Sequence, residues 1–428
     1  MTACPKFLAA FVALALAACD SKPPTTSASA PAHGHGAHAP GTNPTPSPSA
    51  TGHAGHGSGS GTKKEVVRAG VESLDVAVDG TTIHLLLGNY DTNSKTPALL
   101  HTRSTDGGNT WSPAVRVDAG ATPPKSPHRG MDAQFAAHGK QLVALWGTAG
   151  TGLFGSGPIA TARSEDGGAT WRPGPNPADD GLTTGHGFVD IAADTSGTFH
   201  LVWLDSRDGK QGLRYAQSKD GGESWAKNVT LKSDTCECCW NSLALGADGS
   251  VHVLFRDKQP RDMAVISSGN AGAHWRSPAK LGQFNWEFAG CPHVGGGLAL
   301  RGSAIHALVW TGAASQSGVY HLTSGDQGQS WSTPQRLGDS DARRGDMASA
   351  GPLSLAAVWD RVSDGESAVV ATISSDGGKT WNSPKQLSPK GVNAAYPRVV
   401  PVAGRYRVFW TESFTGAPSK WRTALVTH

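Results

Sequence analysis

One eight-residue pattern, Ser-x-Asp-x-Gly-x-x-Trp, occurs six times along this chain of 428 residues. The copies begin at Ser104, Ser164, Ser218, Ser268, Ser324 and Ser374. Successive copies therefore start 50 to 60 residues apart. A regular period of this length indicates one supersecondary unit repeated along the chain, so we expect the fold to be an array of such units.

The residue types in the pattern suit a structural turn. Aspartate at the start of a turn accepts hydrogen bonds from nearby backbone amides, and glycine supplies a positive φ. The tryptophan can fill the space between neighbouring sheets. We therefore expect a structural role, and not a catalytic one, for the third residue of each copy: Asp106, Asp166, Asp220, Asn270, Asp326 and Asp376.

Short runs of alternating apolar and polar residues surround each copy, which is typical of half-buried strands. In the first repeat, SLDVAVDG, TIHLLLGN and ALLHTR precede the pattern, and SPAVRVD follows it. The chain also contains 55 glycines and 14 tryptophans, as expected of a turn-rich all-β protein. The sequence thus predicts four-stranded sheets, with the pattern between the third and fourth strand of each.

The pattern resembles the Asp box of sialidase-like β-propellers, also called the BNR repeat, and the resemblance covers about residues 64–428. It implies an all-β propeller of four-stranded blades. The segment after the last box supplies three further strands without a box, and the missing fourth strand could come from 65–68. Closure by an N-terminal strand would remove open sheet edges. We therefore favour seven blades, with six, the number usual in sialidases, as the alternative.

The first 18 residues are predicted to be an export signal, because an apolar stretch too short to span a membrane follows Lys6. Leu16-Ala17-Ala18-Cys19 resembles a bacterial lipobox, which implies cleavage before Cys19 and lipid attachment there. The resemblance implies a protein anchored in the cell envelope and facing the periplasm, and Asp20 favours the inner membrane over the outer. A secreted protein without a lipid is the alternative.

Residues 19–62 are predicted to be a disordered tether, and 63–428 the propeller. The tether is rich in Pro, Ser and Gly and cannot bury enough apolar surface to fold. Its five histidines either bind transition metals weakly or are incidental to a polar spacer: His33, His35, His38, His53 and His56. A net charge of +3 gives no reason to expect a nucleic-acid partner.

All four cysteines of the predicted propeller fall in two segments, 234–240 and 289–293, which open adjacent blades. Loops at the blade entrances should meet over the central channel. One interpretation is a pair of disulfides, for example Cys236 with Cys239 and Cys238 with Cys291, as expected of an exported chain. The other is a site for a soft metal, or a redox-active thiol site that binds metal when reduced.

The soft-metal interpretation favours copper over zinc, because Cys-x-Cys-Cys is not a standard zinc spacing. Two other blade-entrance segments add soft or nitrogen ligands. The candidate ligands are Cys236, Cys238, Cys239, Cys291, His293, Met131, Met347 and His128. The favoured function is therefore a tethered binding lipoprotein that holds copper, or zinc, or acts through its thiols.

The resemblance to sialidases implies a different site, with three arginines that clamp a substrate carboxylate, a Tyr nucleophile with a Glu base, and an Asp acid. The Arg-Ile-Pro motif usual in the first blade is missing here. Charged residues near the expected channel face remain as candidates: Arg129, Arg344, Arg398, Asp205, Arg256 and Asp257. A sialidase-like exo-glycoside hydrolase is thus the alternative, together with a non-catalytic propeller that binds a glycan or a protein.

Overall fold

The computed structural model describes residues 70–427, except 92–95, 127–129 and 182–184. These residues belong to one compact unit, Glu65–His428. The predicted signal, the predicted lipidation site Cys19, the predicted tether and the predicted closing segment 65–68 lie outside the described residues, as do His128 and Arg129. Within the described part, no helix has the length and apolar character needed to cross a bilayer.

The described chain consists of 27 strands and one 3-10 turn, η1 (Leu153–Gly155). The first three groups of strands are β1 (Gly70–Asp79), β2 (Thr82–Asp91), β3 (Thr96–Ser104), β4 (Val115–Arg116); β5 (Gln134–His138), β6 (Gln141–Ala149), β7 (Ser156–Ser164), β8 (Arg172–Gly174); and β9 (Gly187–Ala193), β10 (Phe199–Asp205), β11 (Gly212–Ser218), β12 (Val229–Lys232). The next three are β13 (Ser242–Leu245), β14 (Val251–Arg256), β15 (Met263–Ser268), β16 (Ala279–Lys280); β17 (Gly297–Arg301), β18 (Ala304–Thr311), β19 (Gly318–Ser324), β20 (Gln335–Gly338); and β21 (Ala342–Ser349), β22 (Leu355–Ser363), β23 (Glu366–Ser374), β24 (Lys385–Gln386). The last group is β25 (Asn393–Val402), β26 (Arg405–Phe414) and β27 (Ala417–Val426).

Hydrogen bonds join these strands into six sheets, five with four strands and one with seven. Each four-stranded sheet is an antiparallel meander. The seven-stranded sheet combines β25–β27 with β1–β4, and these two parts are joined by one parallel residue pair, Gly70 with Ser419. The predicted all-β class and four-stranded antiparallel sheets are confirmed.

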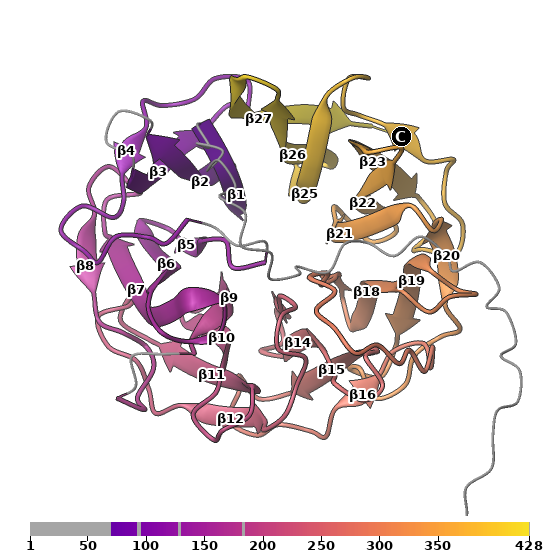
Figure 1. The fold of residues 1–428 in the computed structure, drawn as a ribbon, viewed down its shortest axis with the longest axis horizontal. Coiled ribbons are helices and arrows are strands. Elements are labelled where there is room, and N and C mark those ends of the chain that lie inside the picture. The colour runs from indigo at the N-terminus through magenta and orange to yellow at the C-terminus, as the bar shows by residue number, and fades with distance from the viewer. Residues whose placement is uncertain (1–69, 92–95, 127–129, 182–184, 428) are drawn as a thin grey trace, which may run out of the picture. The chain divides into compact units, whose positions relative to one another are not determined.

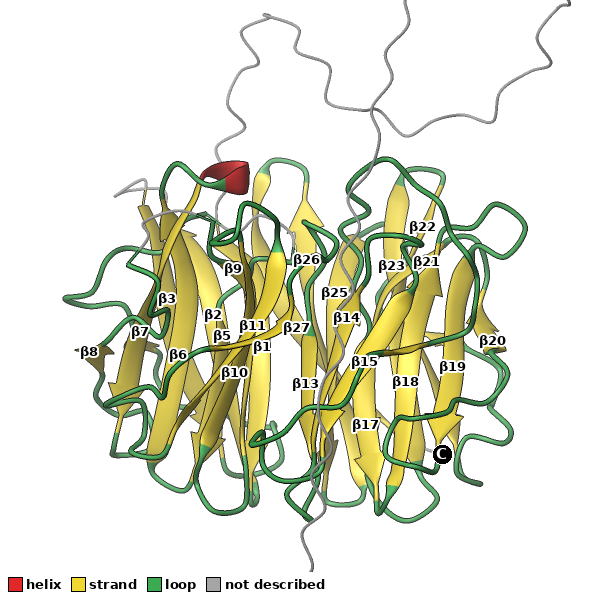
Figure 2. Ribbon diagram, turned by 90° about the horizontal axis from the view of Figure 1, so that it is seen from below, coloured by secondary structure: helices red, strands yellow, loops and turns green. Residues whose placement is uncertain are grey.

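The first strand of each group lies innermost (Figure 1). Each innermost strand contacts the next one along the chain, from β1 through β5, β9, β13, β17 and β21 to β25, and β25 contacts β1. The apolar cores lie between adjacent sheets; one of them includes Val143 and Leu145 of β6 with Leu201 and Trp203 of β10. Figure 2 shows the strands side-on. The sheets therefore stack face to face around a centre.

The repeated pattern forms the same hydrogen-bonded turn in each copy. In the first, Ser104 Oγ donates to Asp106 Oδ1 at 2.7 Å and accepts from the Gly108 amide at 2.8 Å, while the Thr110 amide donates to Asp106. In the fourth copy Asn270 Oδ1 accepts from the His274 amide at 2.9 Å. An amide oxygen thus replaces the carboxylate oxygen without loss of the turn.

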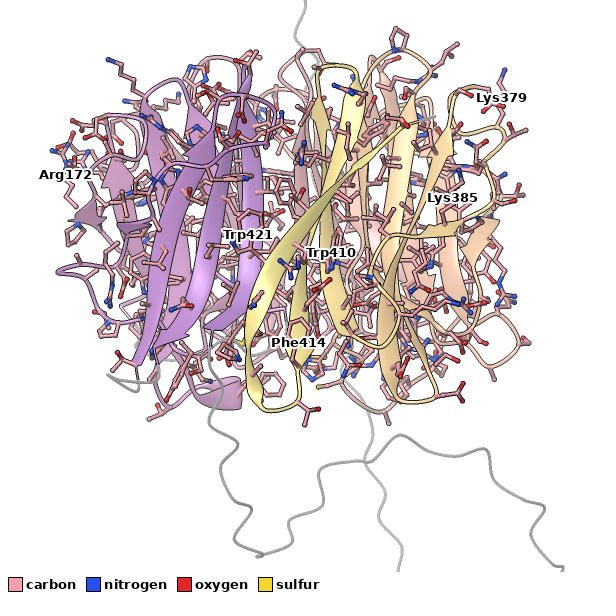
Figure 3. The ribbon with its side chains drawn as sticks, turned by 90° about the horizontal axis from the view of Figure 1, so that it is seen from above. Arg172, Lys379, Lys385, Trp410, Phe414 and Trp421 are labelled. Atoms are coloured by element: carbon pink, nitrogen blue, oxygen red, sulfur yellow. The ribbon has the colours of Figure 1, made fainter. Side chains whose placement is uncertain are left out.

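Each turn also fastens its sheet to the preceding one. A Cβ at Gly168, whose φ is +85°, would lie 2.1 Å from the His101 ring, so only glycine fits there. Trp171 packs edge-on against the same histidine, with the two ring centres 5.5 Å apart. Trp111 packs edge-on against Trp421, with ring centres 5.2 Å apart. Figure 3 shows Trp421 on β27 at the boundary with β1–β4.

The box turns and the connections between second and third strands lie at opposite ends of the sheets. Figure 3 shows Lys379, in the last box, near one end and Phe414, at the β26–β27 turn, near the other. Residues at the second end are free of the repeated pattern. The candidate functional residues lie at this end or in the channel between the innermost strands.

Candidate functional site

A pocket lies where several innermost strands begin. Its polar and aromatic lining comes from the beginnings of four different sheets and from the β25 bulge: Glu72, Asp132, Trp240, Asn241, Arg344, Tyr396 and Arg398. A concave site with a few converging polar groups among apolar ones is the usual form of a small-molecule site.

Arg344 and Tyr396 form the best-defined side of this pocket. The Arg344 guanidinium lies 4.3 Å from the centre of the Tyr396 ring, within cation–π range. Buried Asp360, on β22, accepts a hydrogen bond from Arg344 Nη1 at 3.0 Å and from the Tyr396 amide at 3.1 Å. One carboxylate thus positions both residues. Burial lowers the pKa of Arg344, but Asp360 and then Tyr396 outweigh it and raise the pKa.

Tyr396 has an unusual backbone. Its φ is +58°, and the β25–β26 register shifts between Ala395 and Arg398. Left-handed backbone in a bulky residue costs of order 1 to 3 kcal/mol and is often found at functional sites. The bulge directs a residue that an unbroken strand would have placed elsewhere. The strain is therefore consistent with a side chain held in the pocket for use.

Arg398 lies deeper in the channel, beside three carboxyl groups of innermost strands, Asp75, Asp190 and Asp346. Its Nε lies 3.8 Å from Asp75 Oδ1 and its Nη2 donates to Gln134 at 3.3 Å. Burial lowers the pKa of Arg398, and the surrounding aspartates outweigh this and raise it. Arg398 therefore serves first as the counter-charge of these three aspartates, which we call the acidic ring.

Each of the three channel aspartates also fastens a backbone amide. Asp75 accepts from the Phe135 amide at 3.0 Å, Asp190 from Leu243 at 2.6 Å and Asp346 from Val399 at 3.0 Å. Burial raises the pKa of Asp75 to about 6 and that of Asp190 to about 7, against the opposing effect of Arg398. The three aspartates therefore link neighbouring strands, and the pKa values of Asp75 and Asp190 lie close to neutral pH.

The predicted cysteine loops do meet. The ligand atoms of Cys236, Cys238 and Cys239 lie within 4.8 Å of one another, and so do those of Cys238, Cys291 and His293. Cys236, Cys238 and Cys239 are buried, whereas Cys291 is exposed. All four are free thiols, so the predicted disulfides, Cys236–Cys239 and Cys238–Cys291, are not formed; Cys236 Sγ lies 3.3 Å from Cys239 Sγ, well beyond a bond.

Two guanidinium groups border the cysteines. Arg261 Nη1 donates to Cys236 Sγ at 3.0 Å. Hydrogen bonding with Cys238 and Cys239 lowers the pKa of Cys236, and the Arg256 charge lowers it further. The pKa of Cys238 is raised by its hydrogen bonds to Cys236 and Cys239. The cluster is thus arranged to hold its negative charge first on Cys236.

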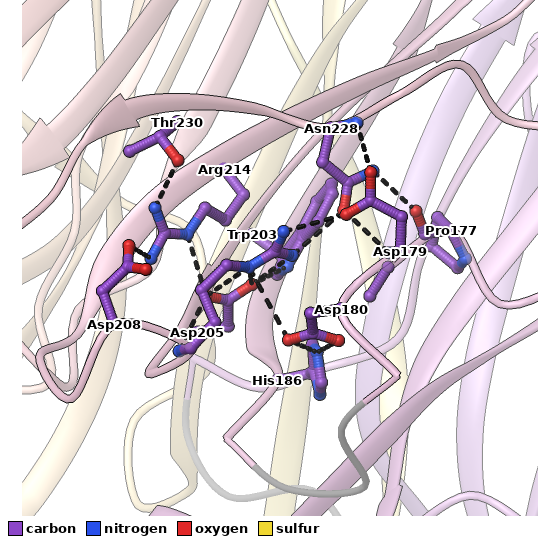
Figure 4. Close-up of polar contacts among 12 residues, drawn as sticks. Pro177, Asp179, Asp180, His186, Trp203, Asp205, Asp208, Arg214, Asn228 and Thr230 are labelled. Carbon is purple, nitrogen blue, oxygen red and sulfur yellow. Dashed lines mark hydrogen bonds and ion pairs between the residues drawn. The ribbon is translucent and has the colours of Figure 1, made fainter.

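A separate charged network surrounds Asp205 at the end of β10 (Figure 4). Asp205 accepts hydrogen bonds from Trp203 Nε1 at 2.9 Å and Arg214 Nε at 2.8 Å, and it pairs with Arg207. Burial raises the pKa of Asp205, but the two arginines outweigh this and lower it. Its oxygens are already in use, so Asp205 is suited to structure and not to proton transfer.

The other predicted residues are dispersed. Met131 packs against the apolar cluster that contains the three buried cysteines, whereas Met347 is buried in a different one with Trp310. Arg256 is buried and Asp257 contacts Lys232. Of the described catalytic candidates, Arg344 and Arg398 line the pocket. Sequence reasoning missed Tyr396 as a site residue, as well as Asp360, Trp240 and Glu72. The run Tyr396-Pro397-Arg398, which places a tyrosine beside the candidate Arg398, was a signal for the first of them.

Comparisons with known proteins agree with this fold. Residues 99–287 match a family model described as a BNR repeat-like domain, as the boxes predicted. No curated protein matches the chain. An ulvan lyase, described as a new polysaccharide lyase family and bound to -[GlcA(1-4)Rha3S]-, is 12% identical with a TM-score of 0.57, over 84% of this chain and 94% of its own.

Two sialidase structures are also similar. A Hadza microbial sialidase is 16% identical with a TM-score of 0.47, over 77% of this chain and 74% of its own. The Trypanosoma rangeli sialidase is 11% identical with a TM-score of 0.47, over 83% and 55%. At such identities, the likeness to the lyase shows a shared fold, and the BNR-type repeat is what this chain has in common with a known family.

Proposed function

We propose that the pocket beside Arg344 and Tyr396 binds a sugar that bears a carboxylate. The observation that carries this proposal is Arg344, a cation that lines the pocket and whose buried Nε makes no hydrogen bond to any described residue. A buried donor without a partner costs about 1 to 3 kcal/mol, which an oxygen of a bound ligand would recover. Guanidinium groups pair well with carboxylates.

The aromatic lining supports a sugar as the carrier of that carboxylate. Trp240 and Tyr396 lie with their ring centres 6.4 Å apart on the pocket wall. Flat, amphipathic rings pack against apolar surface while leaving polar edges available for hydrogen bonds. The saccharide named with the similar ulvan lyase is itself acidic. Arg344 would thus select the acid group, and the rings would hold the sugar face.

Glycoside hydrolysis is the second candidate, and the strained Tyr396 favours it. The pocket also contains two carboxyl groups, Glu72 and Asp132. In the scheme typical of sialidases, a tyrosine oxygen bonds to the anomeric carbon with a Glu as its base, and an acid protonates the departing oxygen. Water then releases the sugar. Tyr396, Glu72 and Asp132 are our proposed residues for these three roles.

Calorimetry with the full chain tests binding against sialyl and uronic oligosaccharides and their neutral counterparts. We expect the acidic sugars to bind and Arg344→Gln to weaken them at least about tenfold, the loss of one charge-assisted hydrogen bond. Arg361→Gln is the matched control, because Arg361 pairs with Asp339 and is not among the pocket residues. Equal binding of neutral sugars would contradict the proposal.

A fluorogenic sialoside and a uronic glycoside test hydrolysis in parallel. Loss of turnover in Tyr396→Phe, with sugar binding retained, would support the nucleophile assignment. Binding without turnover in the wild-type chain would leave a glycan-binding protein and remove the second candidate.

We also infer that the seven-stranded sheet acts as two blades, which makes seven in all. The support is the single residue pair between its two parts and the contacts that run from each innermost strand to the next and from β25 to β1. On this proposal, segment 65–68 completes the last blade. Removing residues 1–69 should then lower the melting temperature more than removing 1–62 does.

We further propose that the chain is a lipoprotein anchored at Cys19 and facing the periplasm, with the inner membrane favoured. The support is the Leu-Ala-Ala-Cys segment after an apolar stretch, followed by Asp20. Mass spectrometry of the N-terminal peptide should find lipid on Cys19, and Cys19→Ala should move the protein to the soluble fraction. A wild-type chain that is already soluble would contradict this.

A further inference from the structure

The cysteine cluster consists of two overlapping triads of possible metal ligands that share Cys238. The first triad is Cys236, Cys238 and Cys239, and the second is Cys238, Cys291 and His293. The first is buried, while the second contains exposed Cys291 and partly exposed His293. The two triads therefore form a continuous series of soft ligands from the surface to the interior.

The buried triad is close to the size of a three-coordinate metal site. At a metal–sulfur length of about 2.3 Å, three sulfurs around one ion lie about 4 Å apart. Cys236 Sγ lies 3.7 Å from Cys238 Sγ and 3.3 Å from Cys239 Sγ. The two separations are about 0.3 and about 0.7 Å shorter than the required value, so the side chains must move outward by less than about 1 Å to hold an ion.

Two buried arginines lie beside the triad. Arg256 is 2% exposed, and its hydrogen bonds go to the carbonyl oxygens of Val294, Arg261 and Trp310, which carry no net charge. A buried guanidinium needs a counter-charge. Arg261, also buried, donates to Cys236 Sγ and pairs with Glu237 at 3.4 Å, and Glu237 also pairs with Lys258 at 2.7 Å. Thiolates that hold a metal ion would supply a counter-charge to Arg256 and a second one to Arg261.

We propose that Cys236, Cys238 and Cys239 bind one Cu(I) ion, and that Cys291 and His293 pass the ion to them through Cys238. Thiolates select soft ions, and zinc in structural sites takes four ligands where this triad offers three. Three thiolates with one Cu(I) carry a charge of −2, and Arg256 and Arg261 beside them offset part of that charge. On binding, thiols release protons to solvent; copper keeps its oxidation state, and no electron is transferred.

Transfer of Cu(I) from its bicinchoninate complex to the full chain, reduced and kept under anaerobic conditions, tests this proposal. We expect one copper per chain in the wild type and its loss in the double variant Cys236→Ser, Cys239→Ser. X-ray absorption should show sulfur ligands around the bound ion. Transfer of zinc(II) in place of copper, or an isolated Cys236–Cys239 disulfide that takes no copper after reduction, would overturn the proposal.

Two controls keep the test decisive. Replacing the five tether histidines with alanine should leave the one copper bound; loss of copper there, with retention in the double cysteine variant, would overturn the proposal. Because serine at buried positions can unfold the chain, circular dichroism accompanies each variant.

Cys291→Ser changes only an exposed thiol, so it should slow copper transfer without changing the final stoichiometry. An unchanged rate would overturn the entry role.

The proposal is independent of the sugar pocket. A chain that binds copper and no acidic sugar would contradict the pocket alone, and the reverse result would contradict the copper site alone.

Discussion

The turns at the box end of the sheets and the loops at the other end belong to the same repeat, but their side chains differ in how uniform they are. At the box end, six copies use nearly the same serine, aspartate and glycine contacts, and each glycine contacts a side chain from the preceding group of strands. At the other end no two blade entrances carry the same residues, and the cysteines, Arg344 and Tyr396 gather there. Uniform chemistry accounts for the fold, and departures from it identify the sites.

Among the changes that test this comparison, substitution of a box glycine should cause the largest loss in the free energy of unfolding. Gly168→Ala places a Cβ 2.1 Å from the His101 ring at a φ of +85°, and we expect a loss of about 3 kcal/mol or more in the free energy of unfolding. Gly80→Ala is the control, with a φ of +58° and nothing within 4 Å, and should lose about 1 kcal/mol. Urea denaturation measures both, and equal losses would show that the close contact is unimportant.

Removing a buried charge at the pocket should be the next largest effect. Asp360→Asn weakens the support of both Arg344 and Tyr396, and we expect a loss of about 3 kcal/mol in stability together with weaker sugar binding. Asp341→Asn, which removes an ion pair to Arg361 at the surface, should cost less than about 1 kcal/mol. A stable Asp360→Asn chain with normal binding would remove Asp360 from the site.

Acid should affect the two regions in opposite directions. Near the boxes, burial lowers the pKa of the stacked pairs His84–His101 and His306–His321 to about 4. The unfolded chain, with histidine near 6.5, then binds more protons, so this stability is complete above about pH 6.5 and is lost as the pH falls toward 4. Replacing His306 and His321 with Gln should flatten that loss in a pH series of melting temperatures.

The channel aspartates should show the opposite sign. Their folded pKa values, about 6 for Asp75 and about 7 for Asp190, lie above the unfolded value, so the folded chain holds extra protons and loses stability as the pH rises from about 4 to 7. Asp190→Asn keeps an oxygen for the Leu243 amide and avoids the buried charge. It should raise the melting temperature at pH 8 more than at pH 4, and a reversed order would contradict the protonated ring.

The smallest effect is expected where the repeat already varies. Asn270→Asp should change the free energy of unfolding by less than about 0.5 kcal/mol, because the asparagine oxygen already accepts the His274 amide. Guanidinium denaturation of the two chains measures this. A gain comparable to a full hydrogen bond would mean that the carboxylate charge, and not the turn geometry, stabilises the other boxes.

The sequence predicted what the repeat controls. Box spacing placed the strands, and the positions of Arg344, Arg398 and the cysteines relative to the boxes placed them in the pocket or in loops that meet. Tyr396 was missed because its place depends on a bulge, which spacing does not show. Met347 and Arg256 were expected at the channel face, but burial between sheets depends on which side of a strand each residue faces. Asp360 acts through partners in two other strands, which no local pattern encodes.

Trp240 follows Cys239 directly in the chain, and its ring forms part of the pocket wall. A Cβ on Gly130 would lie 2.7 Å from this ring and one on Gly295 would lie 2.2 Å from it, so both glycines pack directly against the indole. A shift of Cys239 on metal binding would therefore move Trp240 and change the affinity of the pocket for a sugar. Thermodynamic reciprocity then requires that any change in sugar affinity caused by the ion be matched by an equal change in ion affinity caused by the sugar.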